Sequence, residues 1–410
     1  MENSASAVIE TTSTGPAAEP SGIRERLVCR WLSGTEKGRL TLRFPSGMQQ
    51  TFHGNADGPV ALLQINDPRV YTRLFRSGDM GLAEGYMAGE WDTPDLAAVL
   101  AFGMANEAAL GGALEKSWLM RALDRVRHAG RANTRRGSRR NIAQHYDLGN
   151  NFYRPWLDPS MTYSSALFHN LKEPTETAQR RKYLRLAEMA GLEPGDRVLE
   201  IGCGWGGFAE IAAQEFGCEV VGLTLSREQA AYARRRMTRQ GLADKVEIRL
   251  QDYRDVTETF DKVVSIEMFE AVGEKYWPAF FATLDRCLAP GGRAALQIIT
   301  IDDARFESYR RDPDFIQRYI FPGGMLPSPS AFEAAVTDGG FALREALFFG
   351  KSYAETLRRW DTAFASAWPA LSKLGFDERF RRMWHYYLRY CEAGFDHGAI
   401  DVGHFLIERP

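Results

Sequence analysis

Three closely spaced glycines are the residues with the clearest chemical meaning in this chain. Gly202, Gly204 and Gly207 form a G-x-G-x-x-G pattern directly after the apolar run Arg197–Ile201 and before a helical run at 208–216. Because glycine lacks a side chain, the backbone there can turn sharply and approach a ligand closely. The pattern predicts a nucleotide-cofactor site, and by itself it suits NAD or FAD as well as other cofactors.

Two further features narrow the choice of cofactor. Glu200 precedes the loop, and the next apolar run continues into Leu223-Thr-Leu-Ser226 without the acidic residue that usually binds the ribose of NAD. Leu288-Ala-Pro-Gly-Gly292 forms a predicted turn before another strand. Glu-x-Gly-x-Gly followed by Leu-x-Pro-Gly-Gly resembles the class I S-adenosylmethionine-dependent methyltransferases. Another nucleotide-using enzyme is the alternative.

A narrower resemblance covers roughly residues 80–410. Several motifs, in the same order along the chain, resemble those of the cyclopropane fatty acid synthases and mycolic acid methyltransferases. They are Asn141-Ile-Ala-Gln-His-Tyr-Asp-Leu-Gly-Asn150, Phe152-Tyr153, Trp156-Leu-Asp-Pro-Ser-Met-Thr-Tyr-Ser164, Val198-Leu-Glu-Ile-Gly-Cys-Gly-Trp-Gly206, Leu223-Thr-Leu-Ser-Arg-Glu-Gln229, Met268-Phe-Glu-Ala-Val-Gly273, Tyr319-Ile-Phe-Pro-Gly-Gly-Met-Leu-Pro327, Tyr353-Ala-Glu-Thr-Leu357 and Tyr387-Leu-Arg-Tyr-Cys-Glu-Ala-Gly-Phe395. The resemblance implies an S-adenosylmethionine-dependent enzyme that adds a one-carbon unit to the double bond of unsaturated acyl chains in membrane phospholipids.

The same resemblance implies roles for individual residues. Residues of three motifs would hold the cofactor: Tyr163, Ser164, Gly202, Cys203, Gly204, Thr224 and Gln229. Asp252 and Tyr253 would lie near its adenine, and Glu270 and Tyr319 would lie at the reaction centre. No metal site is expected, because the cysteines lack the spacing of zinc ligands.

The reaction explains why such residues are needed. An isolated alkene is a poor nucleophile, so it attacks a sulfonium methyl group only when it is held in line and shielded from water. Methylation leaves a carbocation on the chain, which aromatic rings and carboxylates stabilise electrostatically. In a cyclopropane synthase a base then removes a proton from the new methyl group, and the ring closes. The resemblance implies that this base is a bicarbonate bound by a cysteine, a glutamate, a histidine and a tyrosine.

Two of these four positions differ in this chain. The family's Tyr-Ser-Cys-Ala is Tyr163-Ser-Ser-Ala166 here, so that Ser165 replaces the cysteine. The family's Leu-His-Thr-Ile is Leu296-Gln-Ile-Ile299, so that Gln297 replaces the histidine. Serine and glutamine still donate hydrogen bonds, but the charge of an imidazolium is lost, and we expect bicarbonate to bind less well. Ser165 and Gln297 join Glu270 and Tyr319 as the candidate catalytic residues.

We therefore expect a methyl-branched product in preference to a cyclopropane. Without a base beside the methyl group, the cation would lose a proton from the neighbouring chain carbon and leave a methyl branch and a shifted double bond. Such chains are precursors of branched or furan fatty acids in related pathways. True cyclopropanation is one alternative, and methylation of a small polar molecule is another. A non-catalytic lipid-binding relative is the third, and the intact glycine loop and Glu270 argue against it.

An α/β domain is required to bring these residues together. Strands are predicted at 197–201, 219–224, 245–250, 260–266 and 293–299, with helices at 208–216 and 226–239. This alternation indicates a Rossmann-like class I methyltransferase sheet, parallel and covered by helices on both faces. Upstream, a smaller N-terminal α+β domain is predicted from alternating runs at 40–44 and 50–53, helical runs at 70–75 and 95–102, and a glycine-rich turn around a short helix at 81–92.

The predicted organisation has four regions. Residues 1–21 are a disordered leader, 22–120 an accessory domain for membrane docking, 121–140 a basic linker and 141–410 the methyltransferase domain. The linker holds seven arginines between Arg125 and Arg140. Near an anionic membrane each basic residue contributes about 1 kcal/mol, so we expect this segment to contact lipid headgroups. A solvated connector is the alternative.

Composition limits the remaining choices. The 410 residues are 44% hydrophobic and 25% charged, as in an ordinary globular protein, and the net charge of -2 gives no general affinity for nucleic acid. Five widely spaced cysteines favour a reducing cytoplasm. No run approaches the roughly 18 apolar residues of a membrane span. We expect a peripheral protein on the inner face of the membrane, and the family resemblance implies a homodimer.

Overall fold

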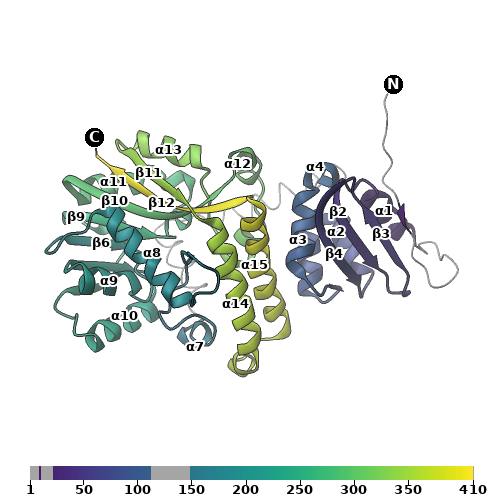
Figure 1. Ribbon diagram of the computed structural model, residues 1–410, viewed down its shortest axis with the longest axis horizontal. Coiled ribbons are helices and arrows are strands. Elements are labelled where there is room, and N and C mark those ends of the chain that lie inside the picture. The colour runs from purple at the N-terminus through teal and green to yellow at the C-terminus, as the bar shows by residue number, and fades with distance from the viewer. Residues whose placement is uncertain (1–8, 11–21, 112–147, 410) are drawn as a thin grey trace. The chain divides into compact units, whose positions relative to one another are not determined.

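The computed structural model describes residues 9–10, 22–111 and 148–409. The chain divides into two compact units, one of residues 1–124 with 375–397 and one of residues 125–374 with 398–410 (Figure 1). The predicted basic linker at 121–140, nearly all of the predicted leader and most of the motif at 141–150 lie outside the described residues.

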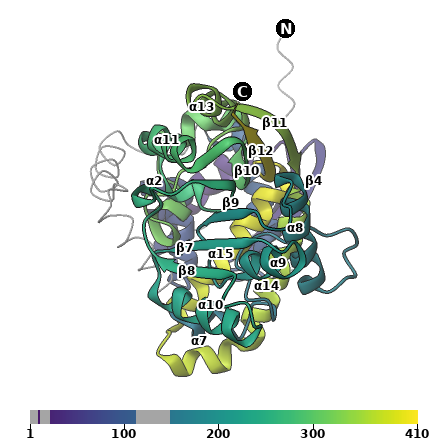
Figure 2. The ribbon, with the colours of Figure 1, turned by 90° about the vertical axis from the view of Figure 1, so that its left-hand side faces the viewer.

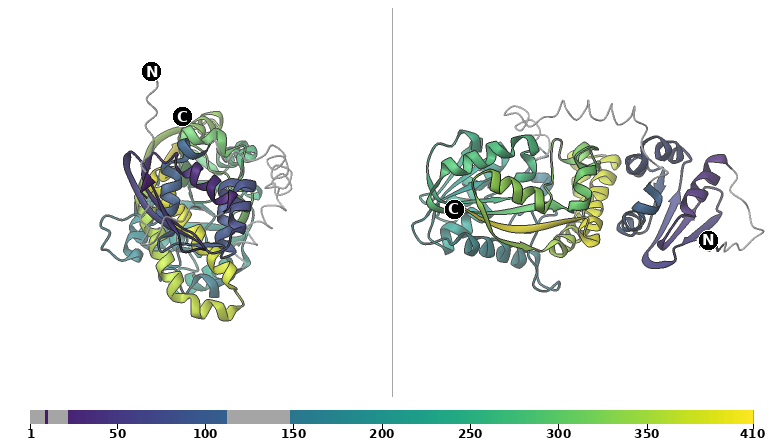
Figure 3. Two further views of the ribbon diagram at one scale, coloured as in Figure 1. Left: turned by 90° about the vertical axis from the view of Figure 1, so that its right-hand side faces the viewer. Right: turned by 90° about the horizontal axis from the view of Figure 1, so that it is seen from above.

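The first unit is built on a small sheet. Its strands run in the order β1 (Ile9–Glu10), β3 (Gln49–His53), β2 (Lys37–Arg43), β4 (Ala56–Ile65) and β5 (Trp91–Asp92). Strand β2 is antiparallel to β3 and parallel to β4. Its helices are α1 (Ile23–Leu32), α2 (Arg69–Met87), α3 (Leu96–Ala105) and α4 (Glu107–Leu110), and α3 packs across β2 and β4 (Figure 3). The smaller α+β fold predicted for this region is therefore confirmed.

The glycine-rich segment at 81–92, predicted as a tight turn around a short helix, contains both features, but its helical part is the end of a longer helix and the turn follows it at 88–89. Helix α2 continues to Met87 past a kink at Gly78, and β5 begins at Trp91. A Cβ on Gly81 would lie 2.0 Å from the carbonyl oxygen of Arg73. Glycine at 81 thus permits two backbone segments to approach closely. A glycine needed for such an approach looks the same in the sequence as a glycine needed for a turn.

Helix α15 (Glu378–His397) packs with the first unit, although the predicted boundary assigns it to the methyltransferase region. The Arg382 guanidinium donates to the carbonyl oxygens of Tyr86 and Trp91 over 2.5 and 2.8 Å. It also lies 4.0 Å from the centroid of the Tyr86 ring. Contacts between segments so far apart in the chain do not alter the local pattern of apolar residues. The sequence therefore could not predict that α15 belongs to the first unit.

The second unit contains a seven-stranded sheet. Its order is β11 (Ala342–Phe348), β12 (Ile400–Glu408), β10 (Leu288–Ile301), β9 (Phe260–Ile266), β6 (Arg197–Ile201), β7 (Glu219–Thr224) and β8 (Val246–Leu250). The five strands from β10 to β8 are parallel, which confirms the predicted Rossmann-like sheet. Strand β12 pairs antiparallel with β10 and β11 and extends the sheet beyond the prediction.

Helices cover both faces of this sheet (Figure 2). On one face α8 (Thr175–Ala190), α9 (Gly207–Glu215) and α10 (Arg227–Arg239) pack on side chains such as Val198 and Val220. On the other, α11 (Trp277–Cys287) and α13 (Pro329–Asp338) pack on side chains such as Leu199 and Val221. Successive side chains of a strand point to opposite faces, so a strand covered on both sides is apolar throughout.

Further helices complete the second unit. They are α7 (Asn150–Tyr153), η2 (Tyr253–Asp255), η3 (Phe269–Ala271), η4 (Glu274–Tyr276), α12 (Asp303–Tyr309), η5 (Ile316–Ile320), α14 (Gly350–Leu371) and η6 (Ser372–Leu374). Among the helices that the structure describes, none combines the length and apolar character needed to cross a membrane.

Candidate active site

The candidate site lies at the carboxyl ends of two adjacent parallel strands, β6 and β9, after which the chain continues toward opposite edges of the sheet. Strand β6 has β7 on one side and β9 on the other, so the connections that follow β6 and β9 diverge. Gly202 directly follows β6, and Glu267 directly follows β9 at the same carboxyl edge. Open α/β sheets bind their ligands in the crevice at such a switch point.

The glycine loop has the backbone geometry that close ligand contact requires. Gly202 and Gly204 have φ angles of +87° and +52°, in the region that other residues rarely adopt. The N–H groups of Gly202 and Cys203 donate to the Leu223 carbonyl oxygen over 3.0 and 2.7 Å. A Cβ on Gly202 would lie 3.1 Å from Cγ of Met268. Cys203 is buried, and burial raises the pKa of its thiol.

A second group of predicted cofactor residues follows β7. The Thr224 hydroxyl donates to Oε1 of Gln229 over 2.7 Å and accepts the Ser226 N–H over 3.1 Å. Ser226 caps α10 by accepting the Gln229 N–H over 3.3 Å. All three residues are buried, so Thr224 and Gln229 are held in place beside the glycine loop.

Asp252 and Tyr253, the predicted adenine neighbours, follow β8. The Asp252 carboxylate binds the Arg254 guanidinium through Nε at 2.9 Å and Nη2 at 2.7 Å. The ring of Tyr253 packs 5.7 Å from that of Phe280, and burial raises the pKa of its hydroxyl to about 12. The arginine partner of Asp252 was not predicted from the motif.

Tyr163 belongs to an aromatic cluster. Its ring stacks on Trp360 with centroids 5.1 Å apart, and it lies 5.3 and 5.8 Å from Tyr153 and Trp156. Trp205, within the glycine loop, contacts Tyr153 with ring centroids 5.2 Å apart. The negative faces of such rings attract cations, which suits both a sulfonium group and a carbocation.

Ser164 is held by a buried lysine that the sequence analysis missed. Lys182 Nζ donates to the Ser164 hydroxyl over 2.6 Å, and the Gln179 amide donates to the Ser164 carbonyl oxygen over 2.8 Å. Lys182 is 0% exposed, and burial lowers its pKa to about 7 against the opposing charge of Glu267. Both polar residues lie on the otherwise apolar face of α8, which is the signal that could have identified them.

Glu267 is the centre of the buried polar network, and it was also missed. Its carboxylate accepts the Ser165 N–H over 2.9 Å, the Gln297 amide over 2.7 Å and the Tyr353 hydroxyl over 2.7 Å. Burial raises its pKa, while the Lys182 charge and these hydrogen bonds oppose the rise. Its signal in the sequence is an acidic residue immediately after an apolar strand.

Ser165 and Gln297 contribute to this network in different ways. Ser165 uses its main-chain N–H, because its hydroxyl donates to the Ala166 carbonyl oxygen over 2.9 Å. Oε1 of Gln297 lies 3.0 Å from Nε2 of His404. An amide oxygen only accepts, so His404 carries a proton on Nε2. Burial lowers the pKa of His404 to about 3, and the ring is therefore neutral.

Glu270 lies close enough to Glu267 for their charges to interact, but it has other partners. Its Oε1 accepts the Ile299 N–H over 2.5 Å. Its Oε2 is buried and has no partner among the described residues. Burial and the charge of Glu267 raise the pKa of Glu270 to about 8, so this carboxyl is largely protonated at neutral pH.

Tyr319 is positioned by the π-helix η5. Its ring lies 5.4 Å from that of Phe315, and the Arg318 guanidinium lies 5.5 Å from its centroid. The chain that follows returns to Glu270, whose carbonyl oxygen accepts the Met325 N–H over 2.7 Å. These ring contacts join Tyr319 to its own segment, and its place at the reaction centre stays a prediction, while the Glu267 carboxylate accepts the Tyr353 hydroxyl.

These residues fit S-adenosylmethionine, which supplies an electrophilic methyl group when bound. The bare backbone of the glycine loop follows β6, Thr224 ends β7 and Asp252 follows β8, so three adjacent strands present candidate contacts at one edge. Glu200, at the base of the loop, is buried with Oε2 unpartnered among the described residues. Burial raises its pKa to about 8.

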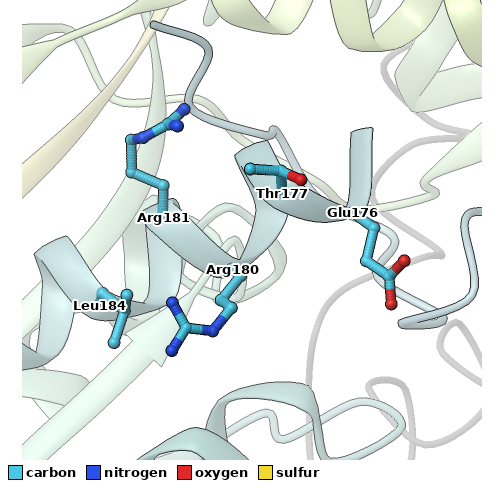
Figure 4. A pocket seen from close by; sticks show the side chains of 5 residues that line it. All are labelled: Glu176, Thr177, Arg180, Arg181 and Leu184. Atoms are coloured by element: carbon cyan, nitrogen blue, oxygen red, sulfur yellow. The ribbon is translucent and has the colours of Figure 1, made fainter. Parts of the chain in front are cut away.

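A pocket of about 350 Å³ lies elsewhere, along α8. It is lined by Glu176, Thr177, Arg180, Arg181 and Leu184 (Figure 4). Arg180 pairs with Glu215, and Arg181 pairs with Glu173. Because its lining is charged and both arginines are already paired, we assign this pocket no part in the reaction.

The acyl-chain substrate implied by the family resemblance predicts a long apolar tunnel, with the aromatic-rich segments 152–168 and 269–281 as its walls, and both segments supply aromatic side chains. The first contributes the cluster around Tyr163. In the second, Phe269 lies 5.4 Å from Trp277 and 5.1 Å from Phe280. These surroundings are apolar enough for an acyl chain, and the tunnel itself stays a prediction.

Comparisons with known proteins agree with this geometry. Residues 133–405 match the family model described as mycolic acid cyclopropane synthetase. The chain is 40% identical to the tuberculostearic acid methyltransferase UfaA1 of Mycobacterium tuberculosis, over 96% of this chain and 93% of that protein. It is 37% identical to the cyclopropane-fatty-acyl-phospholipid synthase of Escherichia coli K12, over 87% and 89%. The crystal structure of mycolic acid cyclopropane synthase CmaA1 complexed with SAH and CTAB superposes with a TM-score of 0.62 at 32% identity, covering 66% of this chain and 98% of that one.

Proposed function

Because this chain belongs to the mycolic acid cyclopropane synthetase family and is an S-adenosylmethionine-dependent methyltransferase of lipid double bonds, we propose that it methylates unsaturated fatty acyl chains of membrane phospholipids to give a methyl-branched unsaturated chain. One observation carries the choice of product. Glu267 accepts the hydrogen bonds of Ser165 and Gln297, the two positions where the family resemblance implies contacts to bicarbonate.

The charge of Glu267 opposes the binding of an external bicarbonate. Such an anion would need the donors that this carboxylate already uses, and it would enter a buried site next to a like charge. Repulsion between close like charges is strong where the effective dielectric constant is low. The geometry therefore disfavours ring closure assisted by bound bicarbonate. It favours loss of a proton from the chain carbon next to the cation.

The other residues of the site suit a carbocation better than a polar substrate. The rings around Tyr163 form an apolar aromatic cluster, and the negative faces of such rings attract a cation. Glu270, protonated at neutral pH, adds a dipole without the cost of a second buried charge. A small polar substrate would instead require a polar lining.

True cyclopropanation is the second candidate product. The observation that favours it is the presence of Glu270 and Tyr319, two of the four residue types that the resemblance implies for bicarbonate binding. The 37% identity to the cyclopropane-fatty-acyl-phospholipid synthase is consistent with this product as well. The count of hydrogens kept on the transferred methyl group distinguishes the two candidates.

The test supplies the enzyme with vesicles of phospholipids that carry unsaturated acyl chains and with cofactor whose methyl group is trideuterated. Mass spectrometry of the fatty acids then counts the deuterium atoms. Retention of all three supports the methyl-branched product. Retention of two means that the methyl group lost a proton, as in ring closure or an exocyclic methylene, and contradicts the proposal. A protein that binds the cofactor but labels no lipid would point to a small-molecule substrate.

We also propose that the protein works as a peripheral protein on the inner membrane surface. The basic segment Arg125–Arg140 is the predicted contact with anionic lipids, and it lies outside the described residues. Cosedimentation with anionic vesicles should fall as salt rises, because salt screens charge attraction. Neutral vesicles are the control. The predicted homodimer is tested by sedimentation equilibrium of the full chain.

A further inference from the structure

We propose that Glu267 is the built-in base of the reaction and accepts the proton that the carbocation loses. This assignment rests on the proposed function and deepens it. It makes Glu267 a catalytic residue that occupies the place of a diffusible anion.

The surroundings of Glu267 are those of an anion site. Donors from a loop, a strand and a helix converge on its carboxylate: the Ser165 N–H, the Gln297 amide on β10 and the Tyr353 hydroxyl on α14. His404 on β12 binds the Gln297 amide oxygen and thereby turns its NH₂ group toward Glu267. Hydrogen bonds to the ionised form favour that form, so the network keeps a buried carboxylate able to accept a proton.

The backbone at Glu267 is held in an uncommon conformation. Its φ angle is +49°, in the left-handed region that residues with a long side chain seldom occupy. Its N–H donates to the Gln297 carbonyl oxygen over 2.8 Å. Strain of this kind persists where the surrounding structure enforces it, and it is concentrated at functional sites. Here it directs the carboxylate into the cluster of donors.

Glu267 lies between the two parts of the site that meet the reacting groups. The next residue, Met268, packs under the glycine loop, within 3.1 Å of where a Cβ of Gly202 would be. On the other side, the Tyr353 ring lies 6.1 Å from Trp360, which stacks on Tyr163. The carboxylate is therefore connected both to the cofactor loop and to the aromatic cluster.

Glu267 suits the role of base better than Glu270 does. Burial raises the pKa of Glu267 as well, but this carboxylate accepts three hydrogen bonds and the charge of Lys182 opposes its protonation. Glu270 accepts one hydrogen bond on its carboxyl group, and the pKa of that group is raised to about 8. A general base must be ionised before it reacts. Glu270 is largely protonated at neutral pH and is thus suited to stabilise the cation as a dipole.

The proposed step is balanced without any further reactant. A C–H bond next to the cationic carbon breaks, and its electron pair forms the new C=C bond, which neutralises the cation. The proton goes to a carboxylate oxygen of Glu267 and leaves to water after the product departs. Because the carboxylate is anchored by its backbone and three donors, it cannot follow the transferred methyl group as a small free anion can.

Two substitutions of the full-length protein test this step. Glu267→Gly suits the backbone, because glycine accepts a positive φ, and it removes the carboxylate while keeping the three donors. Glu267→Gln has nearly the same shape but is not a base. Lipid methylation is measured with both variants and the wild type in buffer freed of carbon dioxide, with and without added bicarbonate or formate. A calorimetric titration of each anion into each protein, saturated with S-adenosylhomocysteine, gives a readout independent of turnover.

We expect methylation to fall about 100-fold or more in both variants, the size of a general-base contribution. Added anion should restore much of the rate to Glu267→Gly, which should also bind it in the titration, and it should affect neither the wild type nor Glu267→Gln. If both variants keep the wild-type rate without anion, Glu267 is not the base. If added bicarbonate raises the methylation rate of the wild type, Glu267 does not occupy the anion site, and the inference is also wrong. If no protein labels lipid although each binds the cofactor product, the proposed function fails, and this inference fails with it.

Discussion

Gln297 and Glu267 are bound to each other twice. The Gln297 amide donates to the Glu267 carboxylate over 2.7 Å, and the Glu267 N–H donates to the Gln297 carbonyl oxygen over 2.8 Å. The parallel pairing of β9 with β10 brings these residues together, because Gln297 lies opposite Ile266, the residue before Glu267. Gln297, at the position where the family resemblance implies a histidine, is therefore the partner of an internal carboxylate.

Tyr353→Phe should shift the pH dependence of methyl transfer upward. The substitution removes the hydroxyl that donates to Glu267 and keeps the ring that contacts Trp360. A hydrogen bond to the charged form lowers a pKa, so its loss raises the pKa of Glu267. We expect the rising limb of the pH–rate profile to move up by roughly one pH unit. Tyr232→Phe on α10 is the control, and an unmoved or lowered limb would contradict the prediction.

His404 should act as a positioning residue through Gln297. His404→Leu removes the donor to the Gln297 amide oxygen, whereas His404→Gln can still provide an N–H. We expect kcat to fall roughly tenfold in the leucine variant, equivalent to about 1.4 kcal/mol, and to recover in the glutamine variant. The KM for the cofactor should stay unchanged in both. Equal losses in the two variants would show that His404 matters only for its shape.

Glu270→Gln should remove a pH-dependent loss of stability. The pKa of Glu270 is raised to about 8 from the usual 4.5. The stability that the protonated carboxyl contributes to the folded state is therefore fully present below pH 4.5 and is lost as the pH rises through 8. The glutamine variant keeps the acceptor for the Ile299 N–H and does not ionise. Its melting temperature should exceed that of the wild type by a margin that grows from pH 5 to pH 8. Calorimetry checks this, with the exposed Glu188→Gln as control; a constant margin would refute it.

Gly202→Ala should weaken cofactor binding by more than its backbone strain alone explains. Its φ is +87°, and the new Cβ would approach Met268 within 3.1 Å beside the cofactor loop. Gly195 has a similar φ of +91° and no neighbouring atom within 4 Å of an added Cβ, so Gly195→Ala is a matched control. Each variant should lose about 1–2 kcal/mol of stability. Only Gly202→Ala should bind S-adenosylmethionine at least about tenfold more weakly by calorimetric titration, the effect of about 1.4 kcal/mol. Equal affinities would remove Gly202 from the cofactor site.

Local patterns of the sequence were sufficient to predict the parallel sheet and the glycine loop. The predicted strands at 197–201, 219–224 and 260–266 coincide with β6, β7 and β9. Strands buried on both faces are apolar along their whole length, and a glycine loop needs its glycines whatever lies around it. Both patterns involve residues that are neighbours in the sequence, so they can be recognised without knowledge of the fold.

Only the tertiary structure decided how the polar residues of the site are connected. Glu267 meets Ser165, Gln297 and Tyr353, which are 102, 30 and 86 residues away in the chain. The same separation hid the placement of α15 and the antiparallel pairing of β12. A hydrogen bond between distant segments depends on how strands pair and helices pack, and it produces no periodic pattern in the sequence around either residue. The sequence by itself thus determined the cofactor loop and the family of the chemistry, and the folded chain determined that the carboxylate of Glu267 accepts the hydrogen bonds of Ser165, Gln297 and Tyr353.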